Sequence, residues 1–114
     1  ATHEPIGGGA AGVLGRYDPA FVASRAQVWG DAHAGWIEEA ASSMAAFRRD
    51  AVIPFLRALR GLGTDTRARV LAAVEETIQR DNAKASALAR VRGLPIPTLA
   101  APSPEDCKRA IGLT

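Results

Sequence analysis

The chain has 114 residues, 47% of them hydrophobic but only 5% aromatic, which is typical of one globular domain whose core depends on a few large side chains. Fourteen Lys and Arg residues against 12 Asp and Glu residues give a formal net charge of +2, an excess too small to indicate a nucleic-acid or membrane partner by itself. The single cysteine, Cys107, excludes an internal disulfide.

Residues 1–17 are predicted to form an extended arm, because they hold five glycines and a proline. The run GGGAAG within them is not a phosphate-binding loop, since no strand precedes it and the Lys-Ser/Thr pair that contacts phosphate is missing. We therefore expect this segment to be flexible or bound to a partner.

A long first helix is predicted from Asp18 to about Asp50. Asp18 and Pro19 form a start signal, because a capping side chain is followed by a proline in the first turn. Gly30 and Gly35 are expected to weaken this helix by about 1 kcal/mol each relative to alanine. Alternating spacings of four and three residues place eight side chains on one face: Val22, Ala26, Trp29, His33, Trp36, Ala40, Ser43 and Phe47.

Pro54 is predicted to end this helical pattern, because proline has no amide donor and clashes with the preceding turn. A short second helix then begins near Val52, and Gly61 and Gly63 supply its end signal. Its apolar residues are Val52, Phe55, Leu56 and Leu59.

A long third helix is predicted to begin at a capping Thr64 or Thr66 and to run to about Arg92. Its inner face consists of five residues at helical spacing: Leu71, Val74, Ile78, Ala85 and Leu88. Asp81 falls within this face. We expect a solvated or oligomer-facing position for Asp81, with a functional carboxylate as the alternative.

Residues 93–103 contain three prolines and no charge, and they are predicted to form an extended crossover. Leu94, Ile96 and Leu99 would prefer burial, so this segment is expected to pack along the bundle or onto another subunit. The following SPEDCKRAIG predicts a short helix over 104–112, with a serine cap, a first-turn proline, early acidic residues and late basic residues.

Candidate catalytic and metal-binding groups are few. His33 has no second ligand one turn away, and Cys107 has no cysteine or histidine at zinc spacing. Cys107 as nucleophile and His33 as base are the one conceivable catalytic pair, and no third group is placed to orient the histidine. We therefore expect no cofactor, no metal and no catalytic site. Packing or an interface contact is the expected role of His33, with a ligand or acid–base role as the alternative.

The arginines are concentrated in one stretch of the sequence. Residues 1–47 have a net charge of −3, residues 48–69 of +4 and residues 70–114 of +1. The guanidinium groups of the middle stretch could bind phosphates, or they could pair with the acidic first helix of a neighbouring copy. The six arginines are Arg48, Arg49, Arg57, Arg60, Arg67 and Arg69.

The run TRARVLAAVEE, followed by NAKASALAR, resembles the third helix and hinge region of lactose-repressor-type transcription factors. The resemblance implies a DNA-binding function, but it covers only a short part of the chain. The preceding DAVIPFLRALRGLG has an interior proline and bulky apolar residues where that family's recognition helix carries polar, base-contacting side chains. The chain is therefore assigned to no family.

Together these patterns predict an all-α protein, a small bundle of two long antiparallel helices and two short ones, with the helical core over residues 18–92. The side chains expected to fill the core are Trp29, Trp36, Phe47, Phe55, Ile78 and Leu88. No apolar run reaches the roughly 18 residues of a transmembrane helix, and the cytoplasm is the default location.

As function we expect a non-catalytic structural or accessory subunit that mediates protein–protein assembly, either as a homo-oligomer or within a larger complex. The alternative is a small DNA-binding protein that uses the arginine cluster at 48–69. The candidate interface residues are Trp29, His33, Trp36, Leu94, Ile96 and Leu99.

Overall fold

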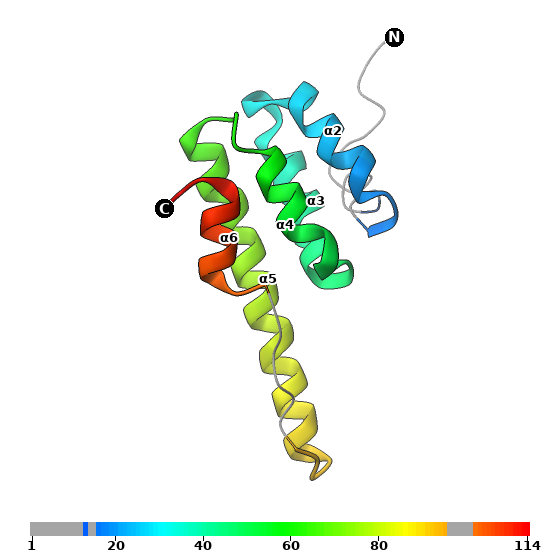
Figure 1. The fold of residues 1–114 in the computed structure, drawn as a ribbon. Helices are drawn as coiled ribbons and strands as arrows, with labels where there is room; N and C mark the ends of the chain where they lie inside the picture. The colour runs from blue at the N-terminus through cyan, green and yellow to red at the C-terminus, as the bar shows by residue number, and fades with distance from the viewer. Residues whose placement is uncertain (1–12, 14–15, 96–101) are drawn as a thin grey trace.

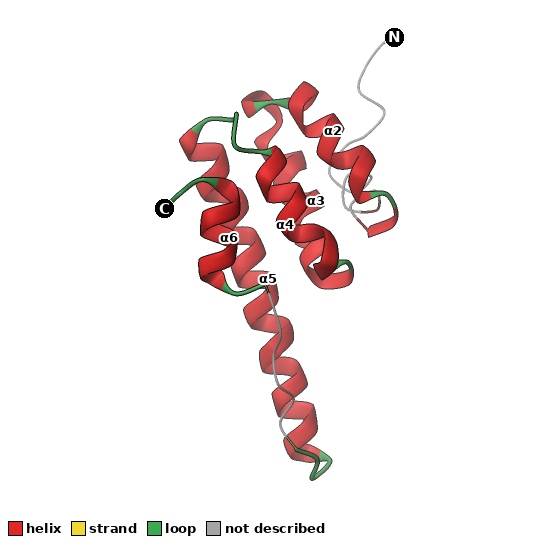
Figure 2. Ribbon diagram, viewed as in Figure 1, coloured by secondary structure: helices red, strands yellow, loops and turns green. Residues whose placement is uncertain are grey.

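The computed structural model describes residues 13, 16–95 and 102–114, and within these residues the protein is all-α, without strands (Figure 2). The predicted fold class, a small helical bundle, is confirmed. The elements are α2 (Pro19–Trp29), a 3₁₀ turn η1 (Asp31–His33), α3 (Ala34–Phe47), α4 (Arg49–Ala58), α5 (Thr64–Val91) and α6 (Pro104–Ile111). No helix in the described ranges is both long and apolar enough to cross a membrane.

Successive helices run in alternating directions (Figure 1). α3 lies against α5 and α4, α2 packs on α4 and α3, and α6 packs on α4 and α5. The C-terminal half of α5 projects beyond the other described helices (Figure 1). The bundle is therefore built around the first half of its longest helix.

The core lies where α2, α3, α4, α5 and α6 meet. Trp29, Phe55 and Ile78 are buried there as predicted, and Trp36 is partly buried. Phe47 and Leu88 are 58% and 50% exposed, so these two core predictions are wrong. Phe47 is the last residue of α3, and Leu88 lies on the projecting half of α5. The largest fully buried side chains are Phe55, Ile37, Met44, Leu56, Leu59, Ile111, Val22, Val52, Val70, Val74 and Cys107.

The predicted first long helix is in fact two helices that are separated at Gly30. α2 ends at Trp29 and α3 begins at Ala34. Gly30 has φ 62° and ψ −165°, a backbone conformation essentially restricted to glycine, so the chain turns there. The prediction of two long antiparallel helices is therefore wrong. Among the described elements α5 is the one long helix, with 28 residues, and α3 has 14.

Pro54 lies inside α4 instead of near its start. α3 ends at Phe47 and α4 begins at Arg49, so the helix boundary predicted near Asp50 is wrong by about one turn. Proline removes the hydrogen bond to the carbonyl four residues earlier, which belongs to Asp50. Because Asp50 is exposed, water can satisfy that carbonyl, and α4 continues through the proline.

Two helix starts follow their sequence signals. Asp18 caps α2, and its carboxylate accepts a hydrogen bond from the Phe21 N–H at 3.2 Å. Ser103 and Asp106 form a reciprocal capping box at the start of α6. Both signals involve partners three residues apart, so the sequence contained all the information needed to predict them.

The two predicted extended segments lie largely outside the described residues. Within residues 1–17, the described Val13, Arg16 and Tyr17 have helical conformations, so the prediction of an extended arm is wrong for these three. Within the crossover, residues 96–101 lie outside the described ranges.

Gly30→Ala is expected to lower the free energy of unfolding by about 1–3 kcal/mol, because alanine is strained at this positive φ. The measurement is the midpoint and slope of urea denaturation. Nothing lies within 4 Å of a Cβ added at Gly30, so backbone strain, and not a steric clash, is the expected cause of the lost stability.

Gly35→Ala is the matched control for this experiment. Gly35 lies in the first turn of α3 at an ordinary helical φ, and an added Cβ would also meet nothing within 4 Å. Alanine should therefore raise stability by up to about 1 kcal/mol. Equal changes at the two glycines would contradict the role assigned to Gly30.

Candidate functional site

The turn between α2 and α3 brings together three of the predicted interface residues. The Trp29 ring meets Trp36 edge-on, with 5.8 Å between ring centroids and 82° between planes. The His33 ring stacks on Trp36 at 4.0 Å and 6°. Trp29 is 2% exposed, Trp36 is half-buried and His33 is exposed, so the stack connects the core to the surface. His33 lies in η1 and not on a helix face, because the helix breaks at Gly30.

The other predicted interface residues are not part of this aromatic cluster. Leu94 is 56% exposed and follows the end of α5, at the opposite end of the molecule from the α2–α3 turn (Figure 1). Ile96 and Leu99 lie outside the described residues. The structure therefore places Leu94 on a second, separate surface.

Asp31 connects the α2–α3 turn to the start of α5. Its carboxylate accepts a hydrogen bond from the Gly63 N–H at 2.9 Å. Gly63 is the N-cap of α5, and no side-chain capping bond is made within the helix by Thr64 or Thr66. The predicted threonine cap is therefore wrong, and the carboxylate that accepts the N–H of the N-cap residue comes from a residue 32 positions away.

Arg60 and Arg67 hold the C-terminal end of α6. Arg60 donates from Nε and Nη2 to the carbonyls of residues 110 and 109, at 2.9 and 2.6 Å. Arg67 donates from Nη1 to the carbonyls of residues 111 and 112, at 3.1 and 3.0 Å. Carbonyls at a helix C-terminus lack intrahelical donors and carry partial negative charge. These two guanidinium groups therefore cap α6.

Two more of the predicted arginines form surface ion pairs. Arg48 pairs with Asp50, at 3.2 Å between Nε and Oδ1, and Arg69 of α5 pairs with Glu38 of α3. All four groups are partly exposed, so these pairs contribute little to stability. Arg57 makes no hydrogen bond or ion pair within the described part of the chain, and it is exposed. The six arginines are therefore not one free basic surface.

Arg57 borders a hollow of about 290 Å³ between α4 and α6. Three guanidinium groups share this hollow with one carboxylate, Asp106, whose Oδ1 lies 2.8 Å from Nη2 of Arg109. Arg109 lies far from the arginine cluster in the sequence, and no local signal associates it with Arg57. The lining residues are Ile53, Arg57, Arg60, Asp106, Arg109 and Ala110.

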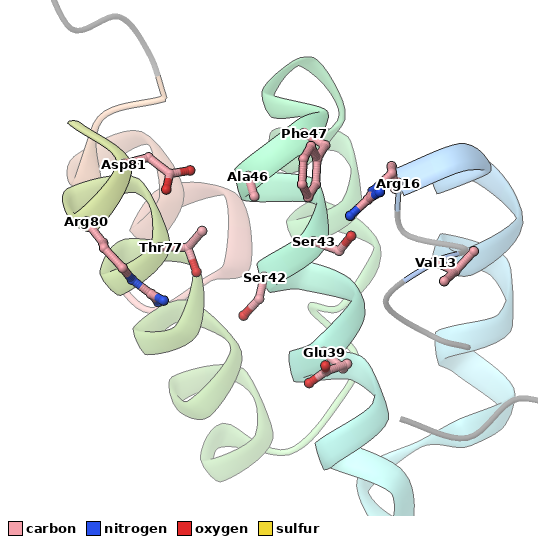
Figure 3. Close-up of a pocket in the computed structure, with 10 residues that line it drawn as sticks. All are labelled: Val13, Arg16, Glu39, Ser42, Ser43, Ala46, Phe47, Thr77, Arg80 and Asp81. Carbon is pink, nitrogen blue, oxygen red and sulfur yellow. The ribbon is translucent and has the colours of Figure 1, made fainter. Parts of the chain in front are cut away.

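A second hollow, of about 400 Å³, straddles α3 (Figure 3). Side chains of α3 lie between those of α5 on one side and Arg16 on the other, and the guanidinium carbon of Arg16 lies 3.7 Å from the centroid of the Phe47 ring. Asp81 is half-buried in this hollow. The lining residues are Val13, Arg16, Glu39, Ser42, Ser43, Ala46, Phe47, Thr77, Arg80 and Asp81.

The second hollow is lined by cationic and anionic side chains and by two serine hydroxyls. Neither of these hydroxyls has a histidine beside it to act as a base. Ser42 and Ser43 share it with two carboxylates and no histidine. Cys107 is buried in α6, where burial, with Glu75 and Asp106 nearby, raises the pKa of its thiol to about 11, so the thiol stays protonated near neutral pH. Within the described ranges no three potential metal ligands lie together.

Comparison of the chain with models of protein families, with curated proteins and with solved structures finds no match. Function is therefore argued from the surfaces and contacts of this chain.

The stability of the protein is expected to fall as the pH drops below about 4, in part because of Asp31. Hydrogen bonds from the Thr66 side chain and the Gly63 N–H, with Arg67 nearby, hold the pKa of Asp31 below its ordinary value of 3.8. A carboxyl with a lowered folded-state pKa stabilises the protein above its unfolded-state pKa and loses that contribution as the pH falls through the folded value. Urea denaturation at a series of pH values measures this dependence.

Asp31→Asn should flatten the acid part of that stability profile, because the amide does not titrate. Asp65→Asn is the matched control, since Asp65 is an exposed carboxyl in the first turn of the same helix. The acid part of the profile should change less in this control than in Asp31→Asn, because Asp31 and not Asp65 accepts the Gly63 N–H. An unchanged profile in Asp31→Asn would contradict a contribution of the Asp31 carboxylate to stability at acid pH.

Proposed function

We propose that this protein is a non-catalytic helical subunit that mediates protein–protein assembly, as a homo-oligomer or within a larger complex. The supporting observation is the α5 arm, defined here as residues 82–95, which lies on the projecting part of α5 (Figure 1). Its three large apolar side chains, Leu88, Val91 and Leu94, are 50%, 85% and 56% exposed. Apolar side chains grouped on one protruding element are typical of contact surfaces.

The packing of α5 against the other described helices supports the same proposal. The large buried side chains of α5 end at Ile78, and Nη2 of Arg49 donates to Oδ1 of Asn82 at 3.1 Å. Beyond Asn82, Ala89 is the one buried residue of the helix. A helical segment of about ten residues gains little stability from its own hydrogen bonds in water, so a partner that covers the arm would stabilise it.

Sedimentation velocity of the purified protein tests this proposal. The unmodified chain is expected to sediment as a defined oligomer when no other protein is present. The double variant Leu88→Gln/Val91→Gln should dissociate at least tenfold more readily, because it removes two apolar anchors worth roughly 1–2 kcal/mol each.

Val28→Gln is the matched control for the arm variant. Val28 is a large apolar residue on α2 that is 66% exposed, and it lies outside the arm. Its replacement should leave the sedimentation profile unchanged. An unmodified chain that stays monomeric at high concentration and captures no protein partner through the arm would refute the assembly function.

A second candidate function is binding of a polyanion such as DNA, and the α4–α6 hollow favours it. Arg57, Arg60 and Arg109 line this hollow with a single carboxylate, and Arg57 has no partner within the described residues. Guanidinium groups bind phosphate oxygens in a bidentate manner. This candidate uses a smaller set of arginines than the cluster at 48–69.

Arg57→Gln/Arg109→Gln should weaken binding to a labelled 30-base-pair duplex and lower the slope of log affinity against log salt by about 2, one for each lost phosphate contact. Fluorescence anisotropy at several salt concentrations measures both. Arg92→Gln is the control, because Arg92 is exposed at the end of α5. Equal affinity of the double variant and the unmodified chain would exclude the hollow as the binding site.

A further inference from the structure

The α5 arm ends in a defined structure and is not a frayed helix terminus. Gly93 has φ 67°, and the Leu94 N–H donates to the Ala89 carbonyl at 2.8 Å, which is the long hydrogen bond of a Schellman motif. This motif turns the apolar residue after the glycine back toward the last helical turn, where Leu88 lies. Leu88 and Val91 are three residues apart and share a face. The arm therefore presents a fixed apolar edge.

An apolar groove lies between α2 and α4. It has a volume of about 740 Å³, and most of its side chains are small, so the backbone of another helix could approach closely. Phe55 is its one large apolar side chain, and Asp50 is its one charged residue. The lining residues are Pro19, Ala20, Ala23, Ser24, Gln27, Asp50, Ala51, Pro54, Phe55 and Ala58.

One end of this groove carries two carboxylates, Asp18 and Asp50, of which Asp50 also pairs with Arg48 on the surface. α2 and α4 run in the same direction (Figure 1), and the Gln27 side chain donates to the Ala58 carbonyl across the groove. The same offset of 31 residues places the start of α2 beside the start of α4. Asp18, the N-cap of α2, therefore lies at the same end as Asp50.

The arm and the groove complement each other in charge, shape and length. The arm carries three basic residues, Lys84, Arg90 and Arg92, and no acidic residue. Its apolar edge is bulky, whereas the groove is lined mostly by small side chains. Ten residues of the arm's helix span about 15 Å, and α2 and α4, with 11 and 10 residues, span about the same. An amphipathic helix laid in an apolar groove is a recurring mode of recognition.

The arm cannot reach the groove of its own molecule. α5 is continuous to Val91, and its projecting half points away from the α2–α4 pair (Figure 1). Pairing of two arms with each other would gather six basic residues without an acidic one, which is electrostatically unfavourable. The groove of a second copy is within reach of the arm, and its charged lining residue, Asp50, is acidic and not basic.

We propose that the α5 arm of one copy lies in the α2–α4 groove of a second copy, with Leu88, Val91 and Leu94 as anchors and with Arg90 and Arg92, near the C-terminal end of the arm, toward Asp18 and Asp50. If both copies exchange arms, two such contacts close a dimer. This inference rests on the proposed assembly function and names the surface that the arm binds.

Two single variants test the exchange. Val91→Asp places a charge on the apolar edge of the arm, and Ser24→Arg places a bulky cation in the groove. Both residues are exposed on helices, so both variants should fold. Sedimentation velocity should show at least tenfold weaker self-association for each variant alone, whereas Gln79→Asp, an exposed α5 residue outside the arm, should behave like the unmodified chain.

Mixing the two variants gives the decisive measurement. With one variant labelled with ¹⁵N, native mass spectrometry of an equimolar mixture should show a dimer with one copy of each. That dimer keeps one intact arm–groove contact and gains an Asp–Arg pair in the other. If Ser24→Arg alone associates like the unmodified chain, the groove is not the partner surface, although arm-mediated assembly stands. If the unmodified chain does not self-associate, both this inference and homo-oligomeric assembly fail.

Discussion

The chain reversal at Gly30 and Asp31 is the constraint on which the rest of the fold depends. The positive φ of Gly30 ends α2 and lets α3 return along the bundle, and Asp31 then fixes this turn to the start of α5 through Gly63. Without the reversal, α2 would continue the line of α3 and could not lie beside α4. The α2–α4 groove and the Trp29–Trp36 contact both follow from that single backbone conformation.

The sequence allowed prediction of those parts of the fold whose determinants are local. The cap at Asp18 and the capping box at Ser103 involve residues three positions apart, so their patterns can be recognised in the chain. Gly30 could not be interpreted in the same way, because a glycine within a helical pattern indicates only a small loss of propensity. Leu88 continues the apolar periodicity of α5, but periodicity does not say where the neighbouring helices end.

The candidate site was less predictable, since it depends on which groups meet across the bundle. The aromatic residues near Trp29 were identified from their spacing, and the structure brings them together by a turn instead of a helix face. The arginine cluster was identified from its net charge. Net charge cannot predict that an arginine will bind backbone carbonyls, because carbonyls carry no formal charge. Arg60 and Arg67 bind such carbonyls in α6. Arg109, which lines the α4–α6 hollow, was missed because it lies far away in the sequence.

The capping of α6 by Arg60 and Arg67, which lie far earlier in the chain, has a consequence for the order of folding. α6 has eight residues, too few to be stable alone in water, and the Arg67 side chain that holds its end precedes Ile111 by 44 residues. Arg60, in the turn after α4, and Arg67, on α5, both precede α6 in the chain, so synthesis produces these two side chains before α6. Closure of this long loop belongs to a late step. Amide hydrogens of α6 should then exchange through local opening, before those of α3 and the first half of α5.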